Sequence, residues 1–150
     1  MKKALLSLAF AFGMIAFASA QSQVLTGPAI TVDKDVHDYG TIPFGGNGQC
    51  EFKVTNTGTE PLILSKCKGS CGCTVPTCEQ NPIAPGGTSM VVVKYDTKRA
   101  GAINKSVTIT SNAVNEPSKV VRIKGTVEAD PNAPAPGSAP VAQPAGPRNN

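Results

Sequence analysis

The amino-acid sequence predicts an all-β protein, a sandwich of about seven short strands. Two observations favour this fold class. Short runs in which apolar and polar residues alternate recur between turn residues, and no segment between residues 30 and 127 shows a helical period. Glycine, proline and asparagine separate these runs at short intervals. An up-and-down β-barrel is the alternative architecture.

The expected strands follow one another along the chain. In order, they are residues 30–34 continued by 36–39, residues 50–55, a strand that begins at 62–64, residues 89–95, a strand through Ile103, Val107 and Ile109, and residues 120–127. The alternation is clearest where Cys50, Phe52 and Val54 are separated by charged residues, which predicts that all three point into the core. That strand ends at Asn56-Thr57-Gly58, because glycine permits the positive φ of a turn.

The first twenty residues have the layout of a secretory signal peptide. Lys2 and Lys3 form a basic start, residues 4–17 are uncharged and mostly apolar, and residues 18–20 are small. An apolar run of about 14 residues is shorter than the roughly 20 that a membrane-spanning helix needs. We therefore expect cleavage before Gln21, a periplasmic or secreted location, and no membrane span after cleavage.

The rest of the chain divides by composition into three parts. Residues 21–29 are a short lead-in, and residues 129–150 are a Pro/Ala-rich tail that we expect to be disordered, since it has few large apolar residues. Between them, residues 30–128 are close to the roughly 100 residues of an immunoglobulin-like domain. The predicted fold is therefore an immunoglobulin-like antiparallel β-sandwich.

The charge balance and the polar motifs argue against several classes of function. The chain has 14 Lys and Arg against 10 Asp and Glu, and loss of Lys2 and Lys3 would reduce the excess from four to two. So mild a balance argues against a nucleic-acid-binding protein. The glycines at 45, 46 and 48 precede a strand rather than a helix, so they do not predict a phosphate-binding loop or another cofactor site.

No catalytic residue is predicted. His37 is the one histidine, and no serine or cysteine nucleophile is associated with it by a known pattern. We expect it to form a hydrogen bond at the end of a strand. Asp33, Asp35 and Asp38 lack the glycine and the distal glutamate of a calcium-binding loop, so they are expected at a solvated strand edge.

Four of the five cysteines, Cys67, Cys71, Cys73 and Cys78, lie between residues 66 and 78. In an exported protein such thiols are usually paired. Five cysteines allow two bridges and one free thiol, and the sequence does not select among the pairings. We favour Cys67 with Cys78, in a cross-linked loop between two strands. Cys71 or Cys73 could instead pair with Cys50 or Cys78, and Cys50 is otherwise a buried or unpaired thiol.

Two other interpretations of these cysteines stay open. Four thiolates could bind zinc or copper(I), although a single C-x3-C-x-C-x4-C segment differs from the two separated pairs of a zinc ribbon. The segment Cys71-Gly72-Cys73 could instead be a redox pair. A bridge between cysteines separated by one residue closes a small, strained ring, and strained bridges are more easily reduced. Lys66 and Lys68 are close enough in sequence to favour its thiolate form.

Several short motifs occur in a characteristic order. They are HDYGTI (37–42), FKVTNTG (52–58), PL (61–62), SCGCT (70–74), PIAPG (82–86), YDT (95–97), SN (111–112), and the glycine and valine at 125 and 127. This order resembles a secreted family of Gram-negative bacteria named only as domain of unknown function 1573 (DUF1573). That family is similar to the immunoglobulin-like domains of abnormal-spindle, hydin and major-sperm-protein type. The resemblance implies a sandwich, a binding or assembly role, and no assigned catalytic residue.

Two functions are compatible with these observations. The first is an exported, non-enzymatic module of the cell envelope that binds a protein or another envelope component through its sheet edges and loops. The second is a periplasmic thiol-redox protein, or a copper- or zinc-binding protein, that uses the cysteines from Cys67 to Cys78. The first requires neither a metal nor a cofactor.

Overall fold

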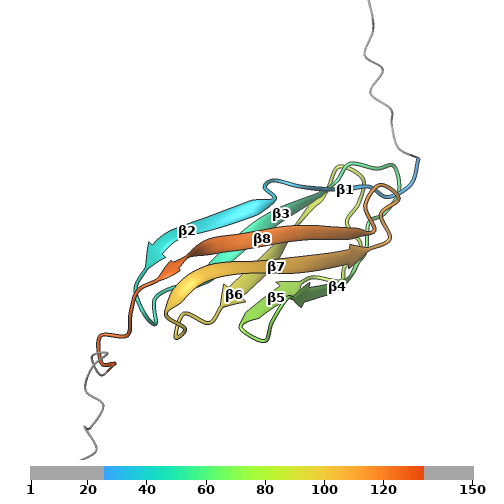
Figure 1. The fold of residues 1–150 in the computed structure, drawn as a ribbon. Coiled ribbons are helices and arrows are strands. Elements are labelled where there is room, and N and C mark those ends of the chain that lie inside the picture. Colours follow the sequence, from blue (N-terminus) through green and yellow to red (C-terminus); the bar gives the residue numbers. More distant parts are fainter. Residues whose placement is uncertain (1–25, 134–150) are drawn as a thin grey trace, which may run out of the picture.

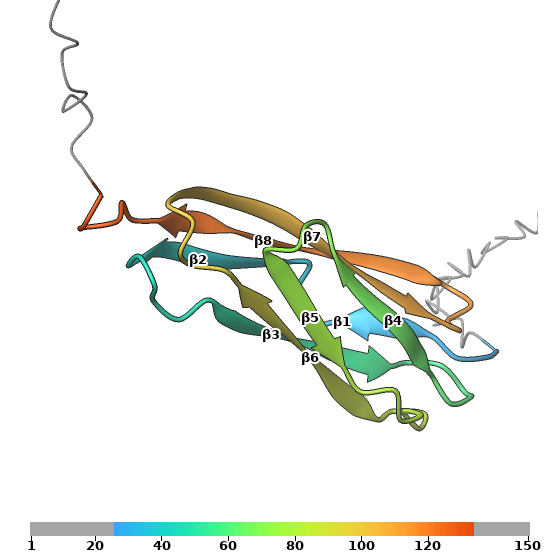
Figure 2. The ribbon, with the colours of Figure 1, turned by 90° about the horizontal axis from the view of Figure 1, so that it is seen from below.

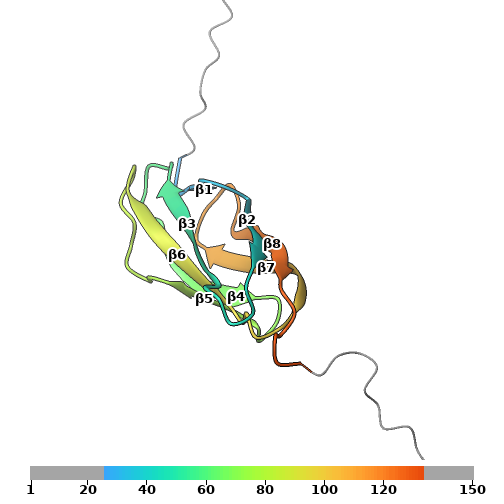
Figure 3. The same cartoon turned by 90° about the vertical axis from the view of Figure 1, so that its left-hand side faces the viewer.

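The computed structural model describes residues 26–133, which form eight strands in two four-stranded sheets packed face to face (Figure 1). The strands are β1 (Ile30–Val32), β2 (Val36–Ile42), β3 (Gln49–Asn56), β4 (Leu64–Gly69), β5 (Thr74–Cys78), β6 (Thr88–Tyr95), β7 (Gly101–Ser111) and β8 (Ser118–Val127). Sheet A has the order β1-β3-β6-β5, and sheet B has the order β2-β8-β7-β4. Seen along the strands, the sheets form two layers (Figure 3). The all-β, immunoglobulin-like prediction is confirmed.

The predicted strand between residues 30 and 40 is in fact two strands in different sheets. β1 pairs antiparallel with β3, and β2 pairs parallel with β8. Asp33 ends the first pairing by accepting a hydrogen bond from the Lys53 N–H (2.8 Å), and the Asp35 carbonyl begins the second by accepting one from the Arg122 N–H (2.8 Å). The sandwich is therefore eight-stranded, and one of its strand pairs is parallel.

The core lies between the two sheets and contains mostly aliphatic side chains. Among the aromatic residues of positions 26–133, Phe52 is the one with no exposed surface, and Tyr95 is nearly as buried. The largest fully buried side chains are Phe52, Ile30, Leu62, Leu64, Ile109, Ile123 and the valines at 54, 91, 93, 107, 121 and 127. In β3, every second residue faces inward, as the sequence alternation predicts.

One buried polar side chain connects several segments of the fold. Asn56, at the end of β3, has no exposed surface. Its Oδ1 accepts hydrogen bonds from the N–H groups of Ala29 (3.3 Å) and Gly58 (3.0 Å). Its Nδ2 donates to the carbonyl groups of Glu60 (2.7 Å) and Ile83 (2.8 Å). All four hydrogen-bonding positions of the carboxamide are occupied, so burial leaves none of them unsatisfied.

The ordered domain begins before the predicted boundary at residue 30. Ala29 is fully buried, and its carbonyl accepts a hydrogen bond from the Thr57 N–H (2.9 Å). The Pro28 carbonyl accepts one from the Val114 N–H (2.8 Å). The end of the predicted lead-in is therefore part of the domain. At the other end, Asp130 closes a short turn with the Ala133 N–H (3.0 Å), while the signal-peptide segment and residues 134–150 of the tail lie outside the described part of the chain.

The edge strands β4 and β5 lie side by side, although they belong to different sheets (Figure 2). A disulfide joins Cys67 of β4 to Cys78 of β5, with 6.2 Å between their Cα atoms. The favoured pairing of Cys67 with Cys78 is confirmed, but most of the cross-linked segment is strand rather than loop. Alternating hydrophobic faces do not reveal this, because the faces of edge strands are only partly buried.

The open edge of β5 offers few hydrogen-bond donors. The Asp96 N–H donates to the Cys73 carbonyl (2.9 Å), so the antiparallel alternation directs the backbone groups of Thr74, Pro76 and Cys78 away from β6. Pro76 has no N–H, and the Thr74 N–H already donates to the Cys71 carbonyl (3.2 Å). This edge is therefore protected against pairing with another strand.

Replacing Asn56 is expected to destabilise the domain strongly. In Asn56→Ala, two backbone N–H groups, one of them buried, and two carbonyl groups lose their partner, so the free energy of unfolding should fall by about 3 kcal/mol or more. Urea denaturation measures the change. The matched control is Asn112→Ala, whose exposed carboxamide also bridges two backbone groups, at Ile63 and Pro61, and should cost about 1 kcal/mol or less. Equal losses in the two variants would contradict the proposed importance of Asn56.

Removing the bridge between β4 and β5 should also reduce stability. For a bridge across a sequence separation of 11 residues, loop-closure entropy predicts a loss of about 3 kcal/mol in the double variant Cys67→Ala, Cys78→Ala. Thermal and urea denaturation under non-reducing conditions measure it. The double variant Cys71→Ala, Cys73→Ala removes a bridge with a sequence separation of two, so its free energy of unfolding should fall by only about 1 kcal/mol. A larger loss of stability in the second double variant than in the first would contradict this account of the two disulfides.

Candidate functional site

The cysteine hairpin (residues 64–78) is the first region that the sequence singled out. Its turn is fixed at both ends, by the Ser70 N–H donating to the Ser106 carbonyl (2.8 Å) and by the Thr74 N–H donating to the Cys71 carbonyl. Cys71 is joined to Cys73 by a disulfide, with 5.2 Å between the Cα atoms, rather than to Cys50 or Cys78. Cys73 is only 6% exposed, whereas Cys71 is half-buried.

The hydroxyl group of Thr74 lies against both sulfur atoms of this bridge. Its Oγ1 is 3.6 Å from Cys71 Sγ and 3.8 Å from Cys73 Sγ. Sulfur atoms in a disulfide carry no hydrogen, so the hydroxyl is the donor. Thr74 is only 2% exposed, and within residues 26–133 its hydroxyl contacts no other hydrogen-bond partner. A buried hydroxyl therefore depends on two weak sulfur acceptors.

Cys50 is the free thiol of the described chain, and it lies in the core at 5% exposure. The nearby Tyr39 hydroxyl donates to the Gly48 carbonyl (2.7 Å). Burial raises the pKa of the Cys50 thiol, and burial together with the adjacent Cys50 raises the pKa of Tyr39 well above its usual value. Both groups stay protonated at neutral pH, which makes Cys50 a poor nucleophile in the folded protein.

The arrangement of the cysteines does not support the zinc or copper interpretation. That interpretation requires four thiolates, and the sulfur atoms of Cys67, Cys71, Cys73 and Cys78 are instead joined in two bridges. Between residues 26 and 133, no group of three or more His, Cys, Asp and Glu side chains is placed to hold a metal ion. The same residues contain no helix long and apolar enough to cross a membrane.

The other polar residues named from the sequence occupy structural positions. His37 stacks edge-on against Tyr39, with 4.6 Å between the ring centroids, so the expected hydrogen bond at a strand end is replaced by a ring contact. Burial, and then the charge of Lys34, lower the pKa of His37. Asp33 and Asp35 lie at the exposed crossover between β1 and β2, where Asp35 pairs with the Lys119 ammonium (2.9 Å). Asp33 and Asp35 are therefore solvent-exposed at the end of a strand, as the sequence predicts.

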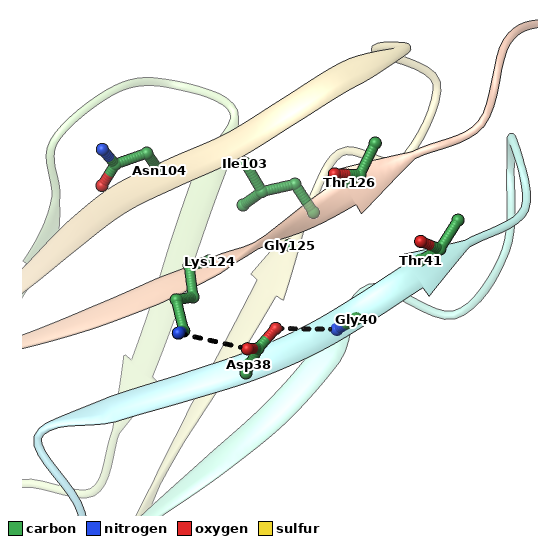
Figure 4. Close-up of a pocket in the computed structure, with 8 residues that line it drawn as sticks. All are labelled: Asp38, Gly40, Thr41, Ile103, Asn104, Lys124, Gly125 and Thr126. Atoms are coloured by element: carbon green, nitrogen blue, oxygen red, sulfur yellow. Dashed lines mark hydrogen bonds and ion pairs between the residues drawn. The ribbon is translucent and has the colours of Figure 1, made fainter.

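A shallow hollow lies on the outer face of sheet B, and the sequence did not predict it. It measures about 480 Å³ and crosses β2, β8 and β7 (Figure 4). Its lining residues are Asp38, Gly40, Thr41, Ile103, Asn104, Lys124, Gly125 and Thr126. Asp38 accepts a hydrogen bond from the Gly40 N–H (2.8 Å) and pairs with Lys124 Nζ (3.2 Å). The hydrogen bond from Gly40, and then Lys124, lower the pKa of Asp38, so the site holds both charges of an ion pair at neutral pH.

Two glycines make the hollow possible. The register of β2 shifts between Asp38 and Thr41, where Gly40 has a φ of 61°. Opposite it, Gly125 has a φ of 150°, and a Cβ at this position would lie 2.8 Å from the Gly40 carbonyl oxygen. Because neither position tolerates a larger residue without strain, no side chain fills this part of the surface.

The hollow lies in the most strongly charged part of the described chain. The strands of sheet B contain six basic residues and one acidic residue, Asp38. The basic residues are Lys66, Lys68, Lys105, Lys119, Arg122 and Lys124. The strands of sheet A contain only Lys53, Lys94 and Glu51. The small net charge of the whole chain therefore hides a strong asymmetry between the two sheets.

On the outer side of sheet B, basic and hydroxyl-bearing side chains surround the exposed Val120 and form a surface that we call the cationic face. It consists of Lys66 and Lys68 on β4, Ser106, Thr108 and Thr110 on β7, and Arg122 and Lys124 on β8. A hydroxyl-bearing strand thus lies between two cationic strands. Between residues 26 and 133, Lys66, Lys68 and Arg122 form no ion pair. The sequence signal for this face is the alternation of basic residues in K-x-K and R-x-K, and it becomes visible only when the two strands are placed in one sheet.

Three solved structures resemble this sandwich. A protein of unknown function from Porphyromonas gingivalis W83 is 17% identical, with a TM-score of 0.60 over 69% of this chain and 48% of that one. The ASH / PapD-like domain 7 of human CEP192 is 10% identical, with a TM-score of 0.56 over 85% of this chain and 100% of that one. The VesB protease of Vibrio cholerae is 16% identical, with a TM-score of 0.53 over 67% of this chain and 32% of that one.

At these identities the likeness shows the fold alone. The chain spans about half the length of the Porphyromonas protein and about a third of the length of the protease. No curated protein matches the sequence. Residues 30–127, which are most of the chain, match the family described as "Protein of unknown function (DUF1573)". The chain therefore belongs to the DUF1573 family, as the order of its motifs predicted.

Proposed function

We propose that this chain is an exported, non-enzymatic binding module of the cell envelope, and that its partner is an acidic glycan. The observation that carries the proposal is the cationic face, where four basic side chains and three hydroxyl groups share the outer side of sheet B. Lys66, Lys68 and Arg122 are free to pair with carboxylates or phosphates of a partner, since no acidic residue of the described chain neutralises them.

The dimensions of the cationic face suit a polymer better than a single small ion. Neighbouring strands are about 4.8 Å apart, so the cations of β4 and those of β8 are separated by about 10 Å. The hydroxyl groups of β7 lie between them. A chain of acidic sugars lying across the sheet could place its charges against both cationic strands and its hydroxyl groups against Ser106, Thr108 and Thr110.

The hollow adds groups that sugars require. The Asp38 carboxylate accepts hydrogen bonds from hydroxyl groups, and Lys124 donates them, while Asn104 can do both. Thr41 and Thr126 contribute further hydroxyl groups along the same rim (Figure 4). At Gly40, where a Cβ would meet no atom within 4 Å, a sugar ring has room to approach the backbone. An acidic sugar fits this mixture of charge and hydrogen-bonding groups better than an apolar ligand does.

Export is supported by two features of the chain. The signal-peptide layout of residues 1–20 is one, although those residues lie outside the described structure. The two disulfides are the other, because bridges persist in oxidising compartments. The non-enzymatic role is supported by the position of His37, which contacts the Tyr39 ring rather than a nucleophile, and by the similarity to the ASH / PapD-like fold.

Reversing two charges of the cationic face should weaken binding to an acidic polysaccharide. Polygalacturonate is the probe, and calorimetry or retention on an immobilised polymer is the measurement. In the double variant Lys66→Glu, Arg122→Glu, two attractions become repulsions, so the affinity should fall by at least roughly tenfold. High salt should weaken the binding of the unmodified protein, because the interacting groups are exposed.

The matched control is Lys53→Glu, Lys94→Glu, which makes the same change in net charge on the outer face of sheet A. It should alter the affinity less than twofold. Neutral dextran should not bind to any of these proteins. Equal losses in the two double variants, or equal binding of dextran and polygalacturonate, would contradict the assignment of the glycan to sheet B.

A further inference from the structure

We infer that the bridge between Cys71 and Cys73 is a thiol-exchange site, which accepts an electron pair from a dithiol carried by a partner peptide. The inference goes beyond the proposed glycan binding and does not depend on it. It rests on three observations: the accessibility of the bridge, the contacts of the Thr74 hydroxyl, and a hollow beside Cys73.

The bridge is open to an incoming thiol. It forms the tip of the hairpin between β4 and β5, and Gly72 between the two cysteines is exposed. A Cβ at Gly72 would meet no atom within 4 Å, so the space next to the bridge is empty. Cys71 is the more exposed of the two cysteines, which makes its sulfur the one that an external thiolate reaches.

The Thr74 hydroxyl lies within reach of both sulfurs of the bridge, so it can donate to Cys73 Sγ when that sulfur leaves. In the oxidised protein this buried donor has only disulfide sulfurs as acceptors, at 3.6 and 3.8 Å. When the bridge opens, Cys73 becomes a thiolate, which is a far stronger acceptor than a disulfide sulfur. The hydrogen bond therefore strengthens as negative charge develops on the leaving sulfur. A hydrogen bond to the thiolate lowers the pKa of the leaving thiol, and exchange is faster when that pKa is lower.

The exchange takes place in two balanced steps. A thiolate of the partner attacks Cys71 Sγ, so that a mixed disulfide forms, the bond between the two sulfurs of the bridge breaks, and the electron pair of that bond goes to Cys73. The second thiol of the partner then loses its proton and attacks the mixed disulfide, which releases Cys71 as a thiolate. The partner dithiol is oxidised to a disulfide, and Cys71 and Cys73 take up the two protons as thiols.

A hollow of about 230 Å³ lies beside Cys73 and Gly72, and it could hold the part of the partner peptide that flanks its thiol. Gly72, Cys73, Val75, Lys94, Tyr95 and Asp96 line it. Val75 is 57% exposed, and Lys94 and Asp96 supply one charge of each sign. A peptide with an apolar side chain beside its thiol would bury that side chain against Val75 while its own polar groups meet the two charges.

The remaining cysteines allow this bridge to open without loss of the fold. The bond between Cys67 and Cys78 holds β4 against β5 independently of the tip. Cys50 is buried in the core and is absent from the residues that line the hollow, so it should neither exchange nor be modified in the folded state.

Graded reduction of the folded protein tests the inference. The full chain is incubated with increasing concentrations of dithiothreitol and quenched with N-ethylmaleimide, and the adducts are located by intact mass and peptide mapping. The expected first product carries two adducts, on Cys71 and Cys73, with the bridge between Cys67 and Cys78 intact and Cys50 unmodified. Thr74→Val should slow this first reduction roughly tenfold, since a hydrogen bond to a charged group is lost.

Thr74→Ser keeps the hydroxyl and should restore the rate, whereas Thr77→Val, at an exposed threonine of the same strand, should leave it unchanged. Opening of the bridge between Cys67 and Cys78 before or together with the tip would overturn the inference. So would equal rates in Thr74→Val and Thr74→Ser. If Thr74→Val does not fold, as circular dichroism would reveal, the order in which the two bridges of the unmodified protein open still decides the question.

Discussion

The satisfied carboxamide of Asn56 is the contact on which the arrangement of this sandwich depends. It holds the segment before β1, the turn after β3, and the strand-like contact between Leu62 and Ile83. Its own backbone N–H and carbonyl pair with Gly87 and Gly86, in the turn that leads into β6. A core of aliphatic side chains does not by itself fix the positions of four connecting segments. A buried amide does, because any displacement leaves polar groups without partners.

The two long edges of the sandwich are closed covalently in different ways. On one side the backbone passes from β1 in sheet A to β2 in sheet B, and on the other the bridge between Cys67 and Cys78 joins β4 to β5. Because Pro76 and the turn at Thr74 leave β5 with few free donors, the outer faces and the tip of the hairpin are the sites at this side of the sandwich best placed for recognition. The charges are concentrated on one of these faces, that of sheet B, and the exposed bridge is at the tip.

The sequence predicts some of these features and not others, for physical reasons. Alternation identifies which residues face inward, so the fold class and the inward position of Cys50 follow from it. It does not identify which sheet a strand joins, so the crossover at Asp33–Asp35 was missed. The cationic face was missed because it combines β4 with β8, which are far apart in the sequence, and because the net charge sums both sheets. The hollow requires Gly40 to lie opposite Gly125, a pairing without a local signal.

The two bridges of the hairpin differ in what they can contribute to stability. Loop-closure entropy grows with the length of chain that is closed, so the bridge across 11 residues restricts the unfolded chain more than the bridge across two. The tip is already fixed by hydrogen bonds at Ser70 and Thr74. A contribution to stability therefore explains the presence of the bond between Cys67 and Cys78 well, but it explains the bond between Cys71 and Cys73 poorly. A buried hydroxyl that has only the sulfurs of the smaller bridge as acceptors is a feature that chemistry at that bridge would use.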